Sequence, residues 1–362
     1  MMFSGATRSD AAAREWTIDD QVMRLREWGT DAIRVLPAPP VSGWMLGAGP
    51  DCAFRLDDPS GRVSRVHAAL THHDRRWLLR DLGSKNGMRI DGARRAEVAL
   101  EPGVEIGIGG LTLIAESARS IALRGYLSRL LGWAADRAAI VDQALRAVRA
   151  AVQHRSALVV SGDGDLVPVA HAIHRRTLGD RPFVVCDPRR RSGDATVRSA
   201  PNRGSGTAAF AVARGGSVCV RTRRLPDDFA ELLAAVRDPD AGVQLVVCVG
   251  SAEDYRPYTA APIVVPPLAR RAAELDMIIA ECIDDARTEL GLPRAALLAS
   301  DRAWIRGHAP SLPEIEKAAL RLLALRRTGS VAEAADRLGM AEVSLARWLG
   351  RRKLAGPTPA PA

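Results

Sequence analysis

The stretch from Gly61 to Gly92, GRVSRVHAALTHHDRRWLLRDLGSKNGMRIDG, constrains the fold of this 362-residue chain more than any other. Apolar and polar residues alternate in Val66–Leu70 and again in Trp77–Arg80, and turn-forming residues follow each run. Such alternation is typical of short, half-buried strands in an antiparallel sheet. The polar residues gather in the turns, so we expect the loops of this sheet to carry its chemistry.

These turns offer the donors that a phosphate ester needs. Ser64 supplies a hydroxyl, Asn86 an amide, and Arg62 and Lys85 two cations, from two different loops. Hydroxyl, amide and cationic donors together can satisfy the oxygens of a phosphate group. The alternative is a sheet domain retained for packing or for protein contact without phosphate.

The pattern resembles the forkhead-associated (FHA) domain, a β-sandwich that binds phosphothreonine peptides through loops at one end. The resemblance extends over Ile33–Glu116 and rests on four pieces: SRVH at 64–67, DLGSKNG at 81–87, DG at 91–92 and LEPG at 100–103. In the family, Ser64 would bond the phosphate, Asn86 would hold the peptide backbone, and His67 would brace the loop. The resemblance thus implies a phosphopeptide site made of Arg62, Ser64, Arg65, Ser84, Lys85 and Asn86.

One position departs from the family. FHA domains usually carry Gly-Arg at the end of the second strand, where the Arg contacts the phosphopeptide, but Gly47 is followed here by Ala48. Losing a charge-assisted hydrogen bond costs about 1.5–3 kcal/mol, roughly tenfold to a hundredfold in affinity. We expect Arg62 to compensate for part of this loss.

Length and composition set further limits. A chain of 362 residues suggests two or three domains, and its net charge of +9 favours polyanionic partners, although a solvated Arg-rich surface is the alternative. The five cysteines are odd in number and form no C-x-x-C pair, which favours reduced thiols in a cytoplasmic protein. The sequence has no signal-peptide pattern and no apolar run long enough to span a membrane.

Beyond Ser117 the apolar period changes from two to 3.6 residues, and strands then alternate with helices from Ala157 to Val249. Alternation of this kind predicts a parallel α/β sheet. The turn Gly162–Gly164 follows a buried strand, where a phosphate cradle could form, but no P-loop lysine comes after it.

This region resembles the AAA+ domain of bacterial sigma-54 activators. The likeness rests on the helix around Ala170–His174, the strand Gly215–Val220 and the turn Pro266–Arg271. The family's magnesium-binding Asp-Glu pair falls on Arg221 and Thr222, where a cation repels Mg²⁺. The phosphate loop is short, the sigma-gripping loop is missing, and the sensor Arg is replaced by proline. We therefore expect no enzyme activity and no cofactor, while residual nucleotide binding stays open.

The C-terminal stretch reads as two short helices joined by a tight turn. Ser330 can cap the first helix and Gly339 can form the turn. The layout resembles the Fis-type helix-turn-helix of the same activators, and the resemblance implies DNA contacts from the second helix. The residues concerned are Ser344, Arg347, Arg351, Arg352 and Lys353. The alternative is a helical pair that completes the preceding helical region or dimerises.

The predicted fold is therefore multidomain: an all-β FHA-like sandwich, an α/β AAA+-like parallel sheet with a helical lid, and a small α-helical end. The predicted segments are a flexible arm (1–30), the sandwich (31–116), the α/β core (117–265), the lid (266–325), the helix-turn-helix (326–354) and a disordered tail (355–362). We expect a cytoplasmic signalling and transcription regulator that binds phosphothreonine-containing kinase substrates and DNA, but not membranes. Homo-oligomerisation stays open, and the alternative function is a phosphopeptide-docking scaffold without DNA binding.

Overall fold

The computed structural model describes residues 21–38, 43–74, 76–154, 156–194, 200–251, 253, 256, 258, 261–293 and 296–354. The chain divides into two compact units. The first comprises the described residues up to Ser156 together with Arg176–Gly179, and the second comprises Ala157–Arg175 with the described residues from Asp180 onward. The arm before residue 21 and the tail after residue 354, as predicted from the sequence, lie outside the described residues.

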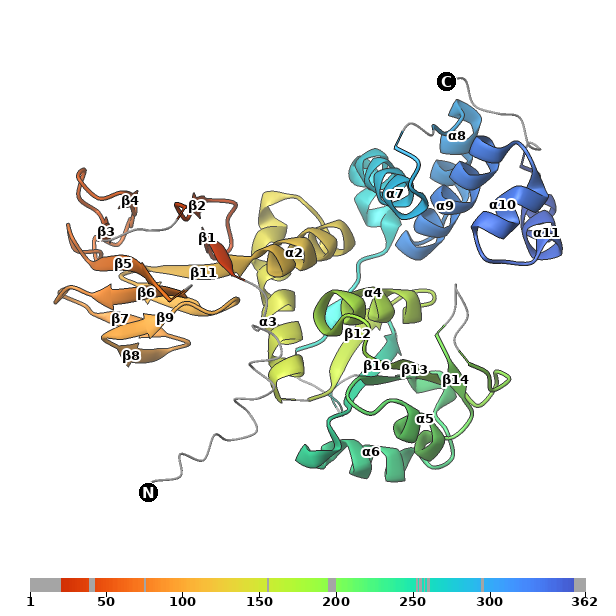
Figure 1. Cartoon of the computed structure of the whole chain (residues 1–362), viewed down its shortest axis with the longest axis horizontal. Coiled ribbons are helices and arrows are strands. Elements are labelled where there is room, and N and C mark those ends of the chain that lie inside the picture. The colour runs from red at the N-terminus through yellow and green to blue at the C-terminus, as the bar shows by residue number, and fades with distance from the viewer. Residues whose placement is uncertain are drawn as a thin grey trace. The chain divides into compact units, whose positions relative to one another are not determined.

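Two sheets form a β-sandwich in the first unit (Figure 1). One has the order β2 (Ile33–Val35), β1 (Val22–Glu27), β11 (Leu111–Ser117), β10 (Glu105–Ile108), β7 (Met88–Ile90) and β8 (Ala93–Arg95). The other has the order β4 (Phe54–Arg55), β3 (Trp44–Gly47), β5 (Ala68–His73), β6 (Arg76–Asp81) and β9 (Glu97–Ala99). Neighbouring strands are antiparallel except β3 and β4. The inward-facing residues, including Leu25, Leu46, Leu70, Leu79 and Ile106, form one apolar core.

The predicted boundary of the N-terminal arm at residue 30 is wrong, because β1 lies inside the first sheet between β2 and β11. A bulge between Val22 and Arg24 interrupts its pairing with β11, so the strand lacks the alternation that would reveal it in the sequence. Arg26 also reads as a surface residue, yet none of its side chain is exposed.

A helical pair, α2 (Ala118–Leu131) and α3 (Ala138–His154), follows the sandwich, and the short η1 turn (Ala135–Arg137) separates the two helices. Ser117 caps α2 in a reciprocal capping box with Ser120. The pair belongs to the compact unit of the sandwich, although the sequence pattern had placed it with the α/β core.

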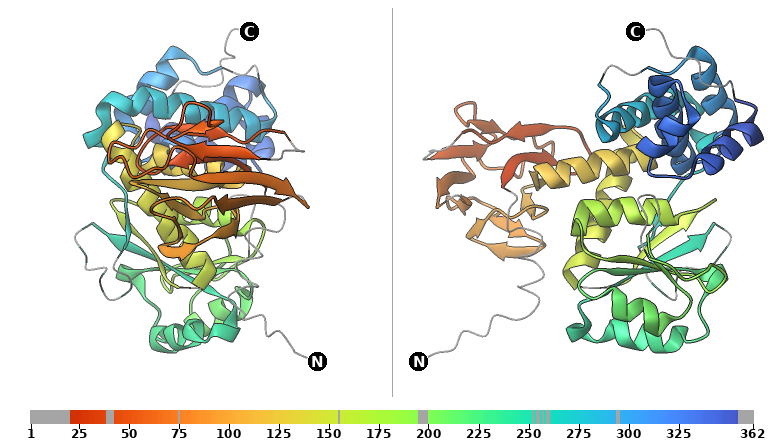
Figure 2. Two further views of the ribbon diagram at one scale, coloured as in Figure 1. Left: turned by 90° about the vertical axis from the view of Figure 1, so that its left-hand side faces the viewer. Right: turned by 45° about the vertical axis from the view of Figure 1, so that its right-hand side comes forward.

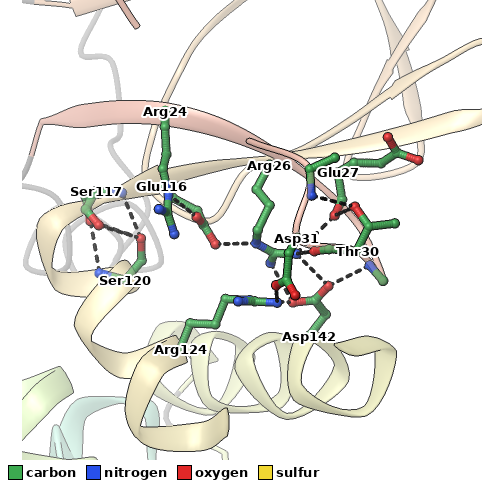
Figure 3. Close-up of polar contacts among 12 residues, drawn as sticks. Arg24, Arg26, Glu27, Thr30, Asp31, Glu116, Ser117, Ser120, Arg124 and Asp142 are labelled. Carbon is green, nitrogen blue, oxygen red and sulfur yellow. Dashed lines mark hydrogen bonds and ion pairs between the residues drawn. The ribbon is translucent and has the colours of Figure 1, made fainter. Parts of the chain in front are cut away.

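Buried charges join the sandwich to this helical pair (Figure 3). On the sandwich side, Arg26 in β1 pairs with Glu116 in β11 through Nε at 2.8 Å. On the helical side, the guanidinium of Arg26 makes two hydrogen bonds to the Asp142 carboxylate in α3, one of them 2.9 Å long. Arg124 in α2 lies between Asp142 and the exposed Asp31. A charge taken out of water needs such partners, so these contacts bind α3 to the sandwich.

The second unit contains the predicted parallel α/β sheet. Its order is β14 (Asn202–Arg203), β13 (Phe183–Cys186), β15 (Ser217–Arg221), β16 (Gln244–Gly250), β12 (Leu158–Gly162) and β17 (Ile263–Val264), and every pairing is parallel. Helix α4 (Val167–Leu178) lies on one face, and α5 (Gly206–Val212) and α6 (Phe229–Arg237) lie on the other (Figures 1 and 2). Short 3₁₀ turns, η2 (Thr222–Arg224) and η3 (Pro239–Ala241), follow β15 and α6.

The rest of the second unit is helical. It contains η4 (Leu268–Glu274), α7 (Leu275–Leu290), α8 (Ala299–His308), α9 (Leu312–Thr328), α10 (Val331–Arg337) and α11 (Glu342–Arg352). The predicted boundary at residue 325 falls inside α9, which ends at Gly329 in the left-handed region. Ser330 caps α10 as expected, and Gly339 turns the chain with a φ of +59°. No helix among the described residues is long and apolar enough to cross a bilayer.

Candidate phosphopeptide site

Two loops at one end of the sandwich carry the predicted site: the β4–β5 loop (residues 56–67) and the β6–β7 loop (residues 82–87). Strand β5 begins at Ala68, so His67 belongs to the first loop and not to the strand as predicted. The Asp58 carboxylate folds this loop, since it accepts hydrogen bonds from the Ser60 hydroxyl and from the backbone N–H groups of Arg62 and Gly110. These bonds, led by that from Ser60, hold the pKa of Asp58 well below its usual range.

His67 joins the two loops from beneath. Its side chain is fully buried; Nδ1 accepts the N–H of Ser64 at 3.1 Å, and Nε2 lies 3.2 Å from the carbonyl of Gly87. The neutral imidazole with its proton on Nε2 satisfies both bonds at once. The expectation that His67 braces the binding loop therefore has a geometric basis.

The hydroxyl of Ser64 lies between the loops and accepts the N–H of Lys85 at 3.1 Å. Asn86 donates its amide to the carbonyl of Arg62 at 2.7 Å. Ser84 supports the second loop, because Asp81 accepts its N–H at 2.7 Å and its hydroxyl at 2.9 Å. Four of the six predicted residues are thus held together by hydrogen bonds, and a fifth, Ser84, fixes the loop that carries two of them.

Three of the predicted residues on these loops carry cationic side chains. Arg62, Arg65 and Lys85 are exposed. Arg65 is held by its backbone: its carbonyl accepts the N–H of Gly49 at 2.9 Å and contacts the Cys52 thiol at 3.0 Å. Exposed guanidinium and ammonium groups beside a fixed hydroxyl and an amide can bind the oxygens of a phosphate ester.

The structure shows why glycine occupies position 47 and what Ala48, which replaces the family's usual Arg, contributes to the site. A Cβ at Gly47 would lie 2.3 Å from the carbonyl oxygen of Arg65, so only glycine fits there. The N–H of Ala48 donates to the carbonyl of Ser64 at 3.0 Å, and its methyl group packs partly against the sandwich core. Position 48 therefore supports the first loop through its backbone but brings no charge to the site.

Comparison with known proteins identifies this sandwich. A family model described as the FHA domain matches residues 44–109. These residues form an FHA domain. The structure adds β1, β2 and β11 to its sheets on either side of the matched segment.

Solved FHA domains are also similar to part of the chain. One, from a study of phosphothreonine-dependent FHA interactions, is 30% identical, with 26% of this chain and 93% of that chain covered and a TM-score of 0.23. The FHA domain of FhaA, complexed with the intracellular domain of Rv3910, is also 30% identical, with 25% and 96% covered and a TM-score of 0.23. The first FHA domain of Rv1747 from Mycobacterium tuberculosis is 25% identical, with 26% and 93% covered and a TM-score of 0.23. No curated protein gives a significant match.

Two contributors to the FHA site were not predicted from the sequence. Asp58 organises the first loop, and the signal for it was the turn sequence Asp-Pro-Ser-Gly that begins there. The second is Arg94 in β8, whose guanidinium Nε lies 2.8 Å from the position that a Cβ on Gly87 would occupy. Pairing of β7 with β8 places this exposed cation beside the second loop, which no local pattern indicated.

The predicted DNA-binding residues lie on α11 and at its end. Ser344, Arg347 and Arg351 are exposed, and so is Lys353, which ends the helix in the left-handed conformation. Arg352 turns toward the protein instead: its guanidinium lies 4.8 Å from the ring centre of Trp348 and 3.4 Å from Glu314. Four of the five side chains are thus available to a ligand, while Arg352 packs α11 against α9.

Proposed function

We propose that this chain is a signalling protein whose FHA domain binds phosphothreonine-containing partners. The observation that carries the proposal is the placement of Ser64 between the two loops: His67 accepts its backbone N–H, and its hydroxyl accepts the N–H of Lys85. A preorganised donor loses little conformational freedom on binding, which favours a specific contact with the phosphate. Because Ala48 stands where the family carries an Arg, we expect weaker binding than in an FHA domain with that residue.

A peptide array tests the proposal. The full-length protein is applied to matched peptides that carry phosphothreonine, phosphoserine or unmodified threonine at the central position. We expect binding of a subset of the phosphothreonine peptides and none of their unmodified counterparts. Equal signals from phosphorylated and unmodified peptides would exclude phosphate recognition and leave the sandwich as a protein-contact domain.

We also propose that the C-terminal helix pair binds DNA, so that a Thr-kinase signal would change DNA occupancy. The support is the exposure of Ser344, Arg347 and Arg351 along α11, the second helix after a tight turn. Basic side chains on such a helix suit contact with phosphates along a groove. If the pair does not bind DNA, a phosphopeptide-docking scaffold is the remaining function.

Fluorescence anisotropy with a generic DNA duplex at decreasing salt tests DNA binding. Replacing both Arg347 and Arg351 with alanine is expected to lower the salt slope by about 1 for each DNA phosphate that the variant no longer binds. Arg302→Ala, at an exposed position on α8, is the matched control and should leave the slope unchanged. Lack of binding by the intact protein, or an unchanged slope in the double variant, would favour the scaffold.

We further propose that the α/β sheet does not hydrolyse ATP. The residues at its carboxyl edge support this proposal: Arg221 at the end of β15 pairs with Asp165 at 2.9 Å and with Asp187 at 3.0 Å. The position that would hold a magnesium ligand in the AAA+ family thus carries a cation engaged with the chain's own carboxylates.

A further inference from the structure

A polar cleft lies at the carboxyl ends of β12, β15 and β16 in the second unit, with a volume of about 350 Å³. The connection that leaves β12 leads to β13 on one side of it, whereas the connection that leaves the neighbouring β16 leads to β17 on the other side, so the two connections run in opposite directions. Open parallel sheets bind ligands at such a reversal, outside the carboxyl ends of the strands. Three arginines from the end of β15 and the following turn line the cleft: Arg221, Arg223 and Arg224.

Each of these cations meets a carboxylate of the chain. Arg221 lies between Asp165 and the fully buried Asp187, which also pairs with Arg224 at 3.1 Å. Arg223 pairs with Glu253, which also accepts a hydrogen bond from the hydroxyl of Thr222. Each of the three cations therefore already has a carboxylate partner, while Arg223 and Asp165 stay 71% and 60% exposed to solvent.

Asp165 differs from the other carboxylates of the cleft because it contacts both the guanidinium of Arg221 and a backbone N–H group at the start of α4. Its Oδ1 accepts the N–H of Val167, at the first residue of α4, at 3.2 Å, and lies 2.9 Å from Nη2 of Arg221. A guanidinium and a backbone N–H at the start of a helix are donors that a phosphate oxygen would use. The neighbouring Asp163 does not share this position, since it bonds the hydroxyl of Ser251 instead.

We propose that the Asp165 carboxylate acts as a tethered anion, which occupies a site for phosphate-type anions between Arg221 and the start of α4. A free phosphate or pyrophosphate must displace this carboxylate and approach Asp163, so the native chain does not bind it. Removing the carboxylate opens the site. The cleft of the second unit consequently does not respond to free phosphate or pyrophosphate.

The test measures binding of inorganic pyrophosphate to the full-length protein by calorimetry at low ionic strength. Asp165→Ser removes the charge but keeps an oxygen that can cap α4. We expect this variant to bind pyrophosphate at least tenfold more tightly than the native protein. Asp163→Asn, the matched control in the same loop, should give a smaller gain, and adding Arg221→Ala to Asp165→Ser should abolish the gain.

The outcomes separate a specific site from a general effect of charge. Native binding as tight as that of the Asp165→Ser variant would overturn the proposal, and so would an equal gain from Asp163→Asn or a gain that survives loss of Arg221. Circular dichroism establishes that each variant is folded. If Asp165→Ser fails to fold, Asp165→Asn replaces it with the same expected gain. None of these results depends on phosphopeptide binding, so failure here and failure of the FHA proposal are distinguishable.

Discussion

Replacing Asp142 with alanine is expected to destabilise the first unit by about 3–5 kcal/mol, because it leaves a buried guanidinium without its main partner. Asp142 is only 1% exposed and accepts hydrogen bonds from Arg26 and from the N–H of Gly29. The Arg26 side chain is fully buried, so water cannot replace the missing carboxylate. Residual pairing of Arg26 with Glu116 offsets only part of the cost.

Amide hydrogen exchange in a urea series measures this effect in the full-length chain. Peptides from β1 and α3 report on the first unit, which avoids treating two units as a single transition. Asp31→Asn is the matched control: Asp31 pairs with Arg124, but its side chain is 75% exposed, so we expect a change below about 1 kcal/mol. A loss below about 1 kcal/mol for Asp142→Ala as well would show that the buried cluster does not hold α3 to the sandwich.

Ser64→Ala is expected to weaken phosphopeptide binding by roughly tenfold to a hundredfold, the equivalent of one hydrogen bond to a charged group. Asn86→Ala should have a similar effect, because it removes the bond to the Arg62 carbonyl that joins the two loops. Fluorescence anisotropy with the best phosphothreonine peptide from the array measures both. Since neither side chain lies in the apolar core, we expect little change in stability.

Thr71→Ala provides the matched control for the hydroxyl. Thr71 lies in the middle of β5, where it pairs with Leu78, away from both loops. This variant should bind the peptide as tightly as the native protein. Binding by Ser64→Ala and Asn86→Ala within about twofold of the native affinity would show that the phosphate is bound elsewhere or not at all.

Local sequence was sufficient to predict those strands, turns and helix caps that depend mainly on neighbouring residues. Strand alternation and turn residues predicted an antiparallel sheet, the resemblance to FHA domains implied a sandwich, and the family comparison confirmed an FHA domain at 44–109. The buried strands of the second half predicted the parallel sheet, which the structure contains. Ser330 and Gly339 marked the ends of α10 because capping and left-handed turns depend on one or two residues.

The sequence did not predict ion pairs between residues that are far apart in the chain. Arg26 and Asp142 lie 116 residues apart, and Arg221 and Asp165 lie 56 apart, so no local pattern showed that the fold pairs them. Arg352 likewise looked like one more basic residue of a DNA-binding tail, but packing of α11 places it against Trp348 and Glu314. Whether a charged side chain is a ligand contact or a buried partner depends on what surrounds it.

The sequence by itself thus determined the two FHA loops and their donors, since those residues lie within 32 positions of one another and fold by local turns. Only the tertiary structure decided that the sandwich continues into α2 and α3, and that Asp165 pairs with Arg221 in the cleft of the second unit. Both features come from ion pairs between remote segments. Desolvating these charges is costly, and the cost is offset only when their partners from remote segments are in place. Residue types alone do not show which remote segments meet.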